Sequence, residues 1–487
     1  MLISDLKLPS SRLAFWVSIG GVAVGIVAGF LAGAQPLYLG LAIVAVVAVI
    51  YFFADFERAV LGLLILRSSL DIFSAQQIPA AFAIGVDALT LLYVTVQLLT
   101  HQSVQTDRFW WFFAGWVALQ GLWVILLPLG GLGLDASVLP DSIREWVRIF
   151  SWLAFYLLVM QLQGRVAPNK IISLLFVSLI VPVTVALLQM FVPSSLLPPL
   201  LSTENVSGLY SVEGANRIKG TLGHPSGLAT YLLLFIGLTY WKLKLTKRSL
   251  PLLILLGLLV FVFVGSKSLS GLAMLGTFVL VATASQLKLK NAIAGILLLV
   301  IVLGLFISTP FGQERLNTFA NTPLFNPNID VSRAILLSRT DLNSFNWRLA
   351  QWTFLLQSWQ NSPFLGHGLS TSHYLSVFHN YAHNDYIRAL VEEGIVGLIA
   401  FLAFLGAQFI RLVYLLRTTP QNSPQRNLCF ILLAILISML VAMATDNIWR
   451  HTPFFFYWWS VFAVAGWNWN QQPANNLVAI NSRGTKV

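Results

Sequence analysis

The sequence predicts an all-α, polytopic integral membrane protein with about 12–14 transmembrane helices. Of the 487 residues, 57% are hydrophobic and 10% are charged, a composition typical of membrane proteins. The apolar residues gather in runs long enough for a helix to cross a bilayer of about 30 Å. The formal net charge is +11, and the basic residues lie in the short connections between these runs, as the positive-inside rule requires. We therefore expect residues 1–487 to form a single polytopic membrane domain.

Apolar runs that span, or nearly span, a bilayer recur along the whole chain. The run at 57–73 is the weakest, because it becomes polar at Arg67 and Asp71; it predicts a short or tilted span, or a re-entrant segment. Counting it gives about fourteen crossings, and pairing or omitting short runs gives about twelve. The other spans are expected at 13–34, 37–54, 81–99, 109–128, 146–162, 171–191, 222–241, 249–265, 269–285, 290–308, 394–416, 427–445 and 453–469.

The basic residues also predict the orientation. With fourteen crossings, the connections rich in Lys and Arg all fall on one side, so we expect that side and both termini to be cytoplasmic. The same count places two long segments outside, at 192–222 and 309–386. The basic residues expected on the cytoplasmic side are Lys7, Arg12, Arg58, Arg108, Arg165, Lys170, Lys242, Lys244, Lys247, Arg248, Lys288, Lys290, Arg411, Arg417, Arg426, Arg483 and Lys486.

Composition excludes several classes of function. The positive charge does not cluster on a soluble domain, so no nucleic-acid partner is expected. The single cysteine, Cys429, lies in an apolar run, which excludes an intrachain disulfide and makes a thiolate metal site implausible. The first apolar run is too long for the core of a signal peptide, so we expect a retained helix.

The external segment 309–386 is longer than a connector needs to be, which favours a functional role. Gly366-His367-Gly368 predicts a tight turn within it. Apolar residues at helical spacing predict an amphipathic helix over 346–360, lying on the membrane surface. They are Phe345, Leu349, Trp352, Leu356 and Trp359.

A second helix is predicted where this segment returns to the membrane. Asn384 is its expected N-cap, and Asp385, Arg388 and Glu392 fall on one face. These charges favour a salt-bridged cluster over the paired acids of a glycoside hydrolase. Gly394 predicts a left-handed stop before a further apolar helix that continues to about residue 416. His383 is thereby held at the edge of the bilayer, a placement that suits proton transfer but also an interfacial histidine beside solvated charges.

Cations form the first group of candidate site residues. Lys267 is the most informative, because it interrupts two apolar runs on the expected outer side. It predicts either a lysine that reaches toward lipid headgroups or, with backbone N–H groups of the broken helix, a site for an anionic headgroup. The cations in the expected external positions are Arg217, Lys219, Lys267, Arg348, Arg388 and Arg450.

Histidines form the second group, and four of the seven lie between His367 and His383. His379 and His383 would suit a metal pair if their segment were helical. The intervening residues indicate a turn and no cysteine lies nearby, so no metal is predicted. A general base is favoured instead, because a neutral imidazole accepts a hydroxyl proton near neutral pH.

Several motifs, taken in order, resemble the bacterial O-antigen ligase and Wzy-type polymerase superfamily. The likeness is best over residues 210–415, and this order on this topology is fairly specific. The motifs are Arg217-x-x-Gly220 followed by His224-Pro225, Ser266-Lys267, Trp347-Arg348 with Trp352, Ser362-Pro363-Phe364-Leu365-Gly366-His367-Gly368, and His383-Asn384 followed by Glu393-Gly394-x-x-Gly397.

The resemblance implies a GT-C-like glycosyltransferase that needs neither a metal nor a cofactor. It would move a glycan from an undecaprenyl-diphosphate carrier to an acceptor hydroxyl on the outer face of the bacterial plasma membrane, with inversion. By this likeness Arg217 and Lys267 would bind the diphosphate, and His383 would act on the acceptor hydroxyl. The family usually has Arg at the position of Lys267, so the bidentate contact of a guanidinium is lost there.

The charge pattern adds further residues to this expected site. Arg348 and Lys219 are grouped with the diphosphate-binding cations, and the supporting residues are His224, Asn384, Arg388 and Glu393. The implied partners are the carrier-linked donor, a glycan or lipid acceptor, the bilayer, and a flippase or chain-length regulator. A ligase and a polymerase share the donor and differ in the acceptor, which the sequence does not specify. The alternatives are a small-anion (bicarbonate-like) transporter and a non-catalytic membrane scaffold.

Overall fold

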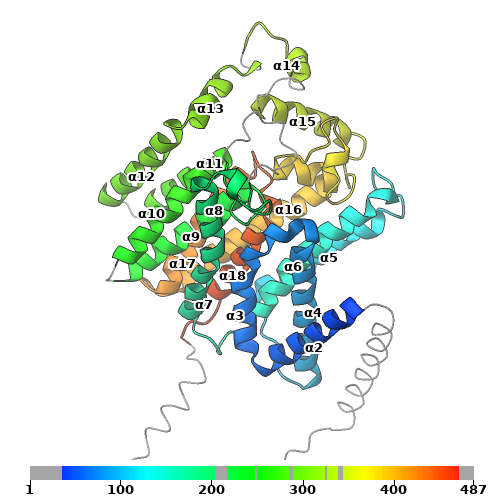
Figure 1. Ribbon diagram of the computed structural model, residues 1–487. Helices are drawn as coiled ribbons and strands as arrows, with labels where there is room; N and C mark the ends of the chain where they lie inside the picture. Colours follow the sequence, from blue (N-terminus) through cyan, green and yellow to red (C-terminus); the bar gives the residue numbers. More distant parts are fainter. Residues whose placement is uncertain are drawn as a thin grey trace, which may run out of the picture. The chain divides into compact units, whose positions relative to one another are not determined.

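The computed structural model describes residues 36–202, 217–246, 249–284, 289–323, 326–337 and 344–470, and within these ranges every regular element is a helix (Figure 1). The predicted all-α, polytopic membrane protein is thereby confirmed. The expected span at 13–34 and both chain termini lie outside the described residues, and the number of crossings stays a prediction. Among the described residues, six helical segments are long and apolar enough to cross a membrane, namely Ile78–Leu99 (α4), Arg108–Leu126 (α5), Pro168–Phe191 (α7 to α8), Pro225–Leu245 (α9), Asp385–Thr418 (α16) and Pro424–Ala442 (α17).

The other helices follow most of the expected runs closely. Shorter apolar helices are found in Ala45–Ala54, Leu250–Gly265, Leu269–Thr283 and Thr452–Ala465. The remaining bounds are α2 (Pro36–Ala54), α3 (Phe56–Leu66), α6 (Leu139–Met160), α7 (Pro168–Leu175), α8 (Ile180–Phe191), α10 (Leu250–Gly265), α11 (Leu269–Ala284), α12 (Leu289–Ile307), α13 (Pro310–Ala320), α14 (Val331–Leu337), α15 (Ser344–Trp359) and α18 (Thr452–Ala465).

The chain divides into two compact units, residues 1–60 and 61–487. Helix α2 belongs to the first unit, and α3 begins in the first and ends in the second. The weak run at 57–73 becomes helix only as far as Leu66, after which two 3₁₀ segments follow. The polar residues that weakened the run form an ion pair there, with 2.5 Å between Arg67 Nη1 and Asp71 Oδ1. The helix therefore ends where the sequence becomes polar.

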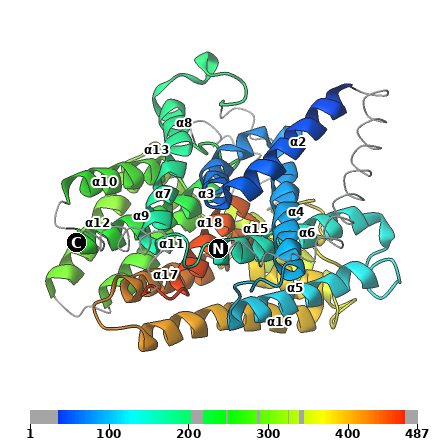
Figure 2. The same cartoon turned by 90° about the horizontal axis from the view of Figure 1, so that it is seen from below.

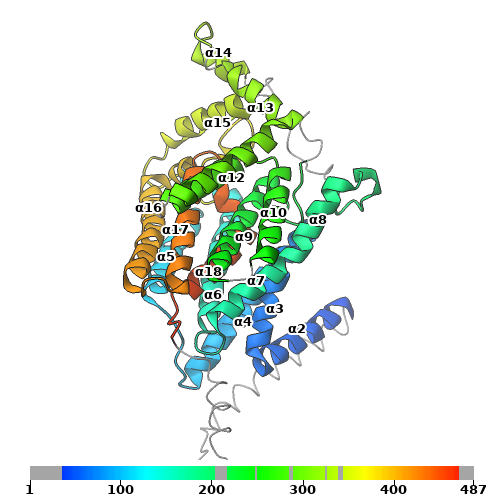
Figure 3. The same ribbon diagram turned by 90° about the vertical axis from the view of Figure 1, so that its left-hand side faces the viewer.

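Helix α18 forms the aromatic core of the second unit. Every residue from Pro453 to Ala465 is buried, and α18 contacts α6, α9 and α17, as Figures 1 and 2 show. Its rings pack at close centroid distances, 4.7 Å for Phe113 with Trp459. Helices α9, α10, α11 and α17 pack together on one side of it (Figure 3). A helix that is apolar all round belongs in such an interior.

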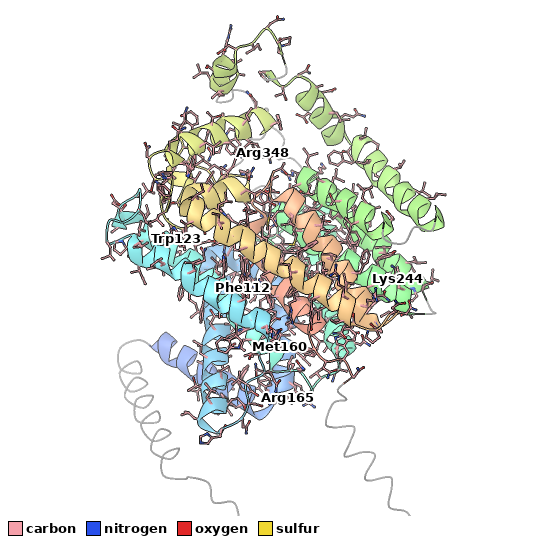
Figure 4. The ribbon with its side chains drawn as sticks, turned by 180° about the vertical axis from the view of Figure 1, so that it is seen from behind. Phe112, Trp123, Met160, Arg165, Lys244 and Arg348 are labelled. Atoms are coloured by element: carbon pink, nitrogen blue, oxygen red, sulfur yellow. The ribbon has the colours of Figure 1, made fainter. Side chains whose placement is uncertain are left out.

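Polar side chains mark two opposite ends of this unit. In the C-terminal half of α16, Arg411 donates to Asp107 Oδ2 at 2.5 Å, and in the last turn of α9, Lys242 donates to Ser173 Oγ at 2.8 Å. Figure 4 shows Arg165 and Arg348 at opposite ends. The sequence predicts Arg165 on the cytoplasmic side of the membrane and Arg348 on the outer side. The two residues lie apart, as this predicted orientation requires. Which end faces the cytoplasm stays a prediction.

Helix α15 confirms the helix predicted at 346–360. Leu355, which is not part of the predicted apolar stripe, is fully buried in a cluster with Ala382 and Val391, and Trp359 of the stripe packs against this cluster. Trp352 donates its indole N–H to the carbonyl of Ala382 at 2.7 Å, whereas Leu356 of the stripe is 37% exposed. The helix therefore packs on the segment leading into α16, and its predicted place on the membrane surface stays a prediction.

Candidate active site

The membrane-proximal end of α16 is built around a break at Gly394. The backbone there has φ +70°, as the left-handed stop predicted, and a Cβ at this position would lie 2.2 Å from the carbonyl oxygen of Phe364. The predicted turn around Gly366 fills the break: the N–H of His367 donates to the carbonyl of Val391, and that of Ile395 donates to Pro363. Backbone groups freed by the break are thus satisfied by one loop.

Arg388 is the centre of a buried ion cluster just before the break. Its Nη1 lies 3.2 Å from both Glu392 and Glu393, and its Nε lies 3.6 Å from Asp385. Gln120 of α5 donates to Glu393 Oε2 at 2.8 Å. The predicted salt-bridged cluster is confirmed, and its burial makes Arg388 and Glu393 structural supports of the α16 start.

Replacing Arg388 with methionine is expected to lower the free energy of unfolding by about 3–5 kcal/mol, because three buried carboxylates lose their common partner. Thermal unfolding of the purified protein in detergent measures this. Arg144→Met is the matched control, since the Arg144 side chain is 79% exposed in its pair with Asp141 and should contribute less than about 1 kcal/mol. Equal unfolding temperatures for the two variants would contradict the assignment.

His383 lies directly before α16, whose predicted N-cap is confirmed: Asn384 Oδ1 accepts the N–H groups of Tyr386 and Ile387. The His383 backbone is left-handed, with φ +49°, and its N–H donates to Asn447 Oδ1 at 2.8 Å. Its ring packs edge-on against Trp347 of α15, with centroids 5.4 Å apart. The imidazole is therefore fixed from two sides.

The carboxylate facing His383 is Asp446, in the connection between α17 and α18. Its Oδ1 lies 3.8 Å from His383 Nδ1, and its Oδ2 accepts the hydroxyl of Ser270 from α11. Burial alone would raise the pKa of Asp446, but the interaction with His383 and the positive groups around it, Arg348 included, hold the pKa well below its usual range. Asp446 is therefore an anion that can orient a neutral imidazole.

The predicted cations meet at the turn between α10 and α11. Arg217 directs its Nε to the carbonyl of Ser266 at 3.5 Å. Lys267, with a left-handed backbone at φ +50°, has a lowered pKa, mainly because it is half-buried and then because Arg217 is near. Gln189 holds the segment in place, since its Oε1 accepts the N–H groups of Lys219 and Gly220.

Lys219 differs from the other predicted cations. Its pKa is lowered by the burial of its ammonium, whereas the pKa of Lys267 also responds to Arg217. The structure therefore groups Arg217 with Lys267 and gives Lys219 a separate environment. Its assignment to the diphosphate stays a prediction.

His224 joins these groups to the core through a chain of hydroxyls and imidazoles. It caps α9, with Nδ1 accepting the N–H of Ser226 at 3.2 Å. Ser226 Oγ lies 3.4 Å from His451 Nε2, and Thr230 Oγ1 lies 2.9 Å from His451 Nδ1. Burial lowers the pKa of His224 to about 4; Asp446 opposes this shift, and Arg217 adds to it. His224 is therefore neutral at physiological pH.

Acidification is expected to destabilise the protein through His224. Its unfolded pKa of about 6.5 exceeds the folded value of about 4, so stability is complete above pH 6.5 and falls between pH 6.5 and 4, by up to about 3 kcal/mol. Unfolding temperature against pH measures this. His224→Asn keeps a capping oxygen without titrating, and it should reduce the loss; an unchanged profile would contradict the assignment.

The structure brings most of the sequence-predicted site residues into one neighbourhood. The pKa of His224 responds to Arg217 and His383, and that of Asp446 responds to His383 and Arg348. His379 and His383 lie on left-handed backbone rather than a helix, so the argument for a metal pair fails. No group of three or more His, Cys, Asp and Glu side chains is placed to hold a metal ion within the ranges the structure describes.

The sequence predicts that Asp446-Asn447 and Arg450-His451, at an external helix junction, could line the same cavity, but it does not identify the residues that they contact. Asp446 and His451 sit beside Asn447 and Arg450 at a helix junction, a polar cluster between apolar runs that signalled a site without showing its partner. Nothing in the sequence marks Ser226 and Thr230 as site residues, because single hydroxyls inside a membrane helix commonly bond their own backbone.

Comparison with known proteins identifies a family that matches the part of the chain holding several of these residues. Residues 252–402 match the O-antigen ligase family, a stretch that contains Lys267, Arg348, His383 and the whole α16 break. The comparison with curated proteins finds no match. The resemblance noted in the motifs is thus confirmed over residues 252–402, which are similar to the O-antigen ligase family.

Proposed function

We propose that this protein transfers a glycan from an undecaprenyl-diphosphate carrier to an acceptor hydroxyl at the outer face of the plasma membrane. The observation that carries the proposal is the meeting of one imidazole with fixed cations from distant segments. His383, Asp446 and Arg217 all act on the pKa of His224, and Lys267 lies beside Arg217. Phosphate recognition needs such cations, and hydroxyl deprotonation needs such a base.

The bond changes follow from these positions. As the acceptor oxygen attacks the anomeric carbon, its proton passes to His383, whose Nδ1 faces Asp446 and whose Nε2 is then the accepting atom. The bond between the anomeric carbon and the diphosphate oxygen breaks, and its electron pair leaves with the carrier diphosphate. Direct attack from the opposite face inverts the anomeric centre.

The cations stabilise the charge that develops on the leaving group. Arg217 and Lys267 meet at a helix break, and Arg348 acts from α15 on the same cluster. Fixed charges in a site of low dielectric cost no reorganisation during the reaction and contribute several kcal/mol. In this scheme the protein itself supplies the electrostatic stabilisation.

Deleting the protein from its producing cell tests this function and separates its two forms. A polymerase predicts that single repeat units accumulate in place of long chains. A ligase predicts long chains that remain on the carrier lipid. Gel electrophoresis of the glycans, with the carrier-linked fraction extracted separately, measures both. Unchanged glycan length and attachment would contradict the proposal.

A further inference from the structure

We propose that a row of rings formed by His373, Tyr374 and Tyr381, here called the ring platform, binds a sugar ring of the acceptor glycan. This inference rests on the proposed function, because it assigns the acceptor side of the same site. The ring platform lies in the loop between α15 and α16.

The three rings contact one another in a row, and the outermost ring is exposed to solvent. The centroids of His373 and Tyr374 are 3.9 Å apart, and those of His373 and Tyr381 are 4.9 Å apart. Tyr374 is 45% exposed. The guanidinium carbon of Arg450 lies 3.6 Å from the ring centroid of Tyr381, so this cation holds the inner end of the platform.

The loop that carries the rings is anchored on its buried side. The buried Glu392 carboxylate accepts the N–H of Ser370 at 2.8 Å and that of Ser372 at 3.1 Å. At the outer end, the Tyr374 hydroxyl donates to Asp141 at the start of α6. Because both ends are fixed, a ligand that binds here does not have to order the loop.

The chemistry of the ring platform suits a sugar better than a phosphate. A sugar ring has a face of C–H groups, which the negative face of an aromatic ring attracts, and hydroxyls at its edges that need donors and acceptors. Beside Tyr374, Arg144 supplies hydrogen-bond donors and Asp141 supplies acceptors. The two charges neutralise each other, with 3.1 Å between Arg144 Nη1 and Asp141 Oδ1. The cations Arg217 and Lys267, which are proposed to bind the diphosphate, lie elsewhere, at the turn between α10 and α11.

The platform lies beside the proposed base. Tyr381 precedes His383 by two residues, a chain distance of at most about 7 Å. Burial lowers the pKa of His373, and the charges that act on it are Glu392, Asp141 and Arg450.

The segment that ends at His383 thus carries the rings, whereas the cations proposed for the donor diphosphate lie at the turn between α10 and α11. A sugar bound at Tyr381 would lie two residues along the chain from the proposed base.

Oligosaccharide binding to the purified full-length protein tests this inference. The probes are oligosaccharides from partial acid hydrolysis of the producing cell's own polysaccharide and, separately, the sugars of its surface glycolipid core. Saturation-transfer NMR measures their affinity. Combining Tyr374→Ala with His373→Ala is expected to weaken binding about tenfold, whereas Tyr374→Phe, which keeps the ring, should stay within about threefold.

The two kinds of probe distinguish the source of the sugar, since a polymerase should bind the polysaccharide fragments and a ligase should bind the core sugars. The alanine variant should also raise the KM for the acceptor and leave that for the donor unchanged. Equal affinity for wild type and the alanine variant, or no binding of either probe to wild type, would overturn the ring platform and leave the proposed function standing. Glycan length and attachment that stay unchanged when the protein is deleted would instead overturn the proposed function, whatever the rings bind.

Discussion

Replacing His383 with asparagine is expected to lower the rate of glycan transfer by about 10²–10⁴-fold, because the acceptor hydroxyl loses the base that takes its proton. Asparagine is chosen because the backbone at His383 is left-handed, with φ +49°, a conformation that asparagine tolerates better than alanine. Transfer of a carrier-linked glycan by the purified protein measures the loss.

His379→Asn is the matched control for this variant. His379 lies in the same loop on left-handed backbone, with φ +47°, but its ring is exposed. Its substitution should leave transfer within about twofold, as for surface substitutions in general. Asp446→Asn should lower transfer as well, because the imidazole loses the anion that orients it. Full activity of the His383 variant would remove it as the base.

Removing the charge of Lys267 is expected to have the second largest effect. Lys267→Gln should lower kcat/KM for the donor by about 10²-fold, because one of the positive groups facing the departing diphosphate is lost. Lys267→Arg keeps the charge and adds a bidentate fork, so it should retain transfer or raise it. This also tests whether the lysine in place of the usual arginine weakens the contact with the diphosphate.

Lys242→Gln is the matched control for Lys267→Gln. Both lysines are half-buried, but Lys242 lies in the last turn of α9, at the other end of that helix from His224, and donates to Ser173. The Lys242 variant should leave kcat/KM for the donor unchanged. Equal losses in the two variants would show that buried positive charge, and not its place in the site, determines the effect.

The sequence predicted the local structure around the site well. Asn384 as N-cap and Gly394 as left-handed stop both follow from local rules, and the structure bears out both. The Arg388 cluster followed from helical spacing alone. These features depend on residues within two turns of one another, which a sequence displays directly.

The parts that could not be predicted depend on contacts between distant segments. Leu355 of α15 lies outside the predicted apolar stripe, yet it is buried against Ala382 and Val391, and no local pattern encodes those partners. Asp446 was one of several carboxylates near the expected outer ends of spans. Only the packing of the α17–α18 connection against the start of α16 brings it to His383.

The central claim is that Arg217, Lys267, Arg348 and His383 surround a lipid-linked diphosphate. A structure of the full-length protein with undecaprenyl diphosphate bound in a lipid nanodisc tests it most directly. The account predicts phosphate oxygens within hydrogen-bonding distance of Arg217 and Lys267, with His383 facing the position that the anomeric carbon would occupy. Phosphates bound at the other end, beside Arg165 or Lys242, would contradict it.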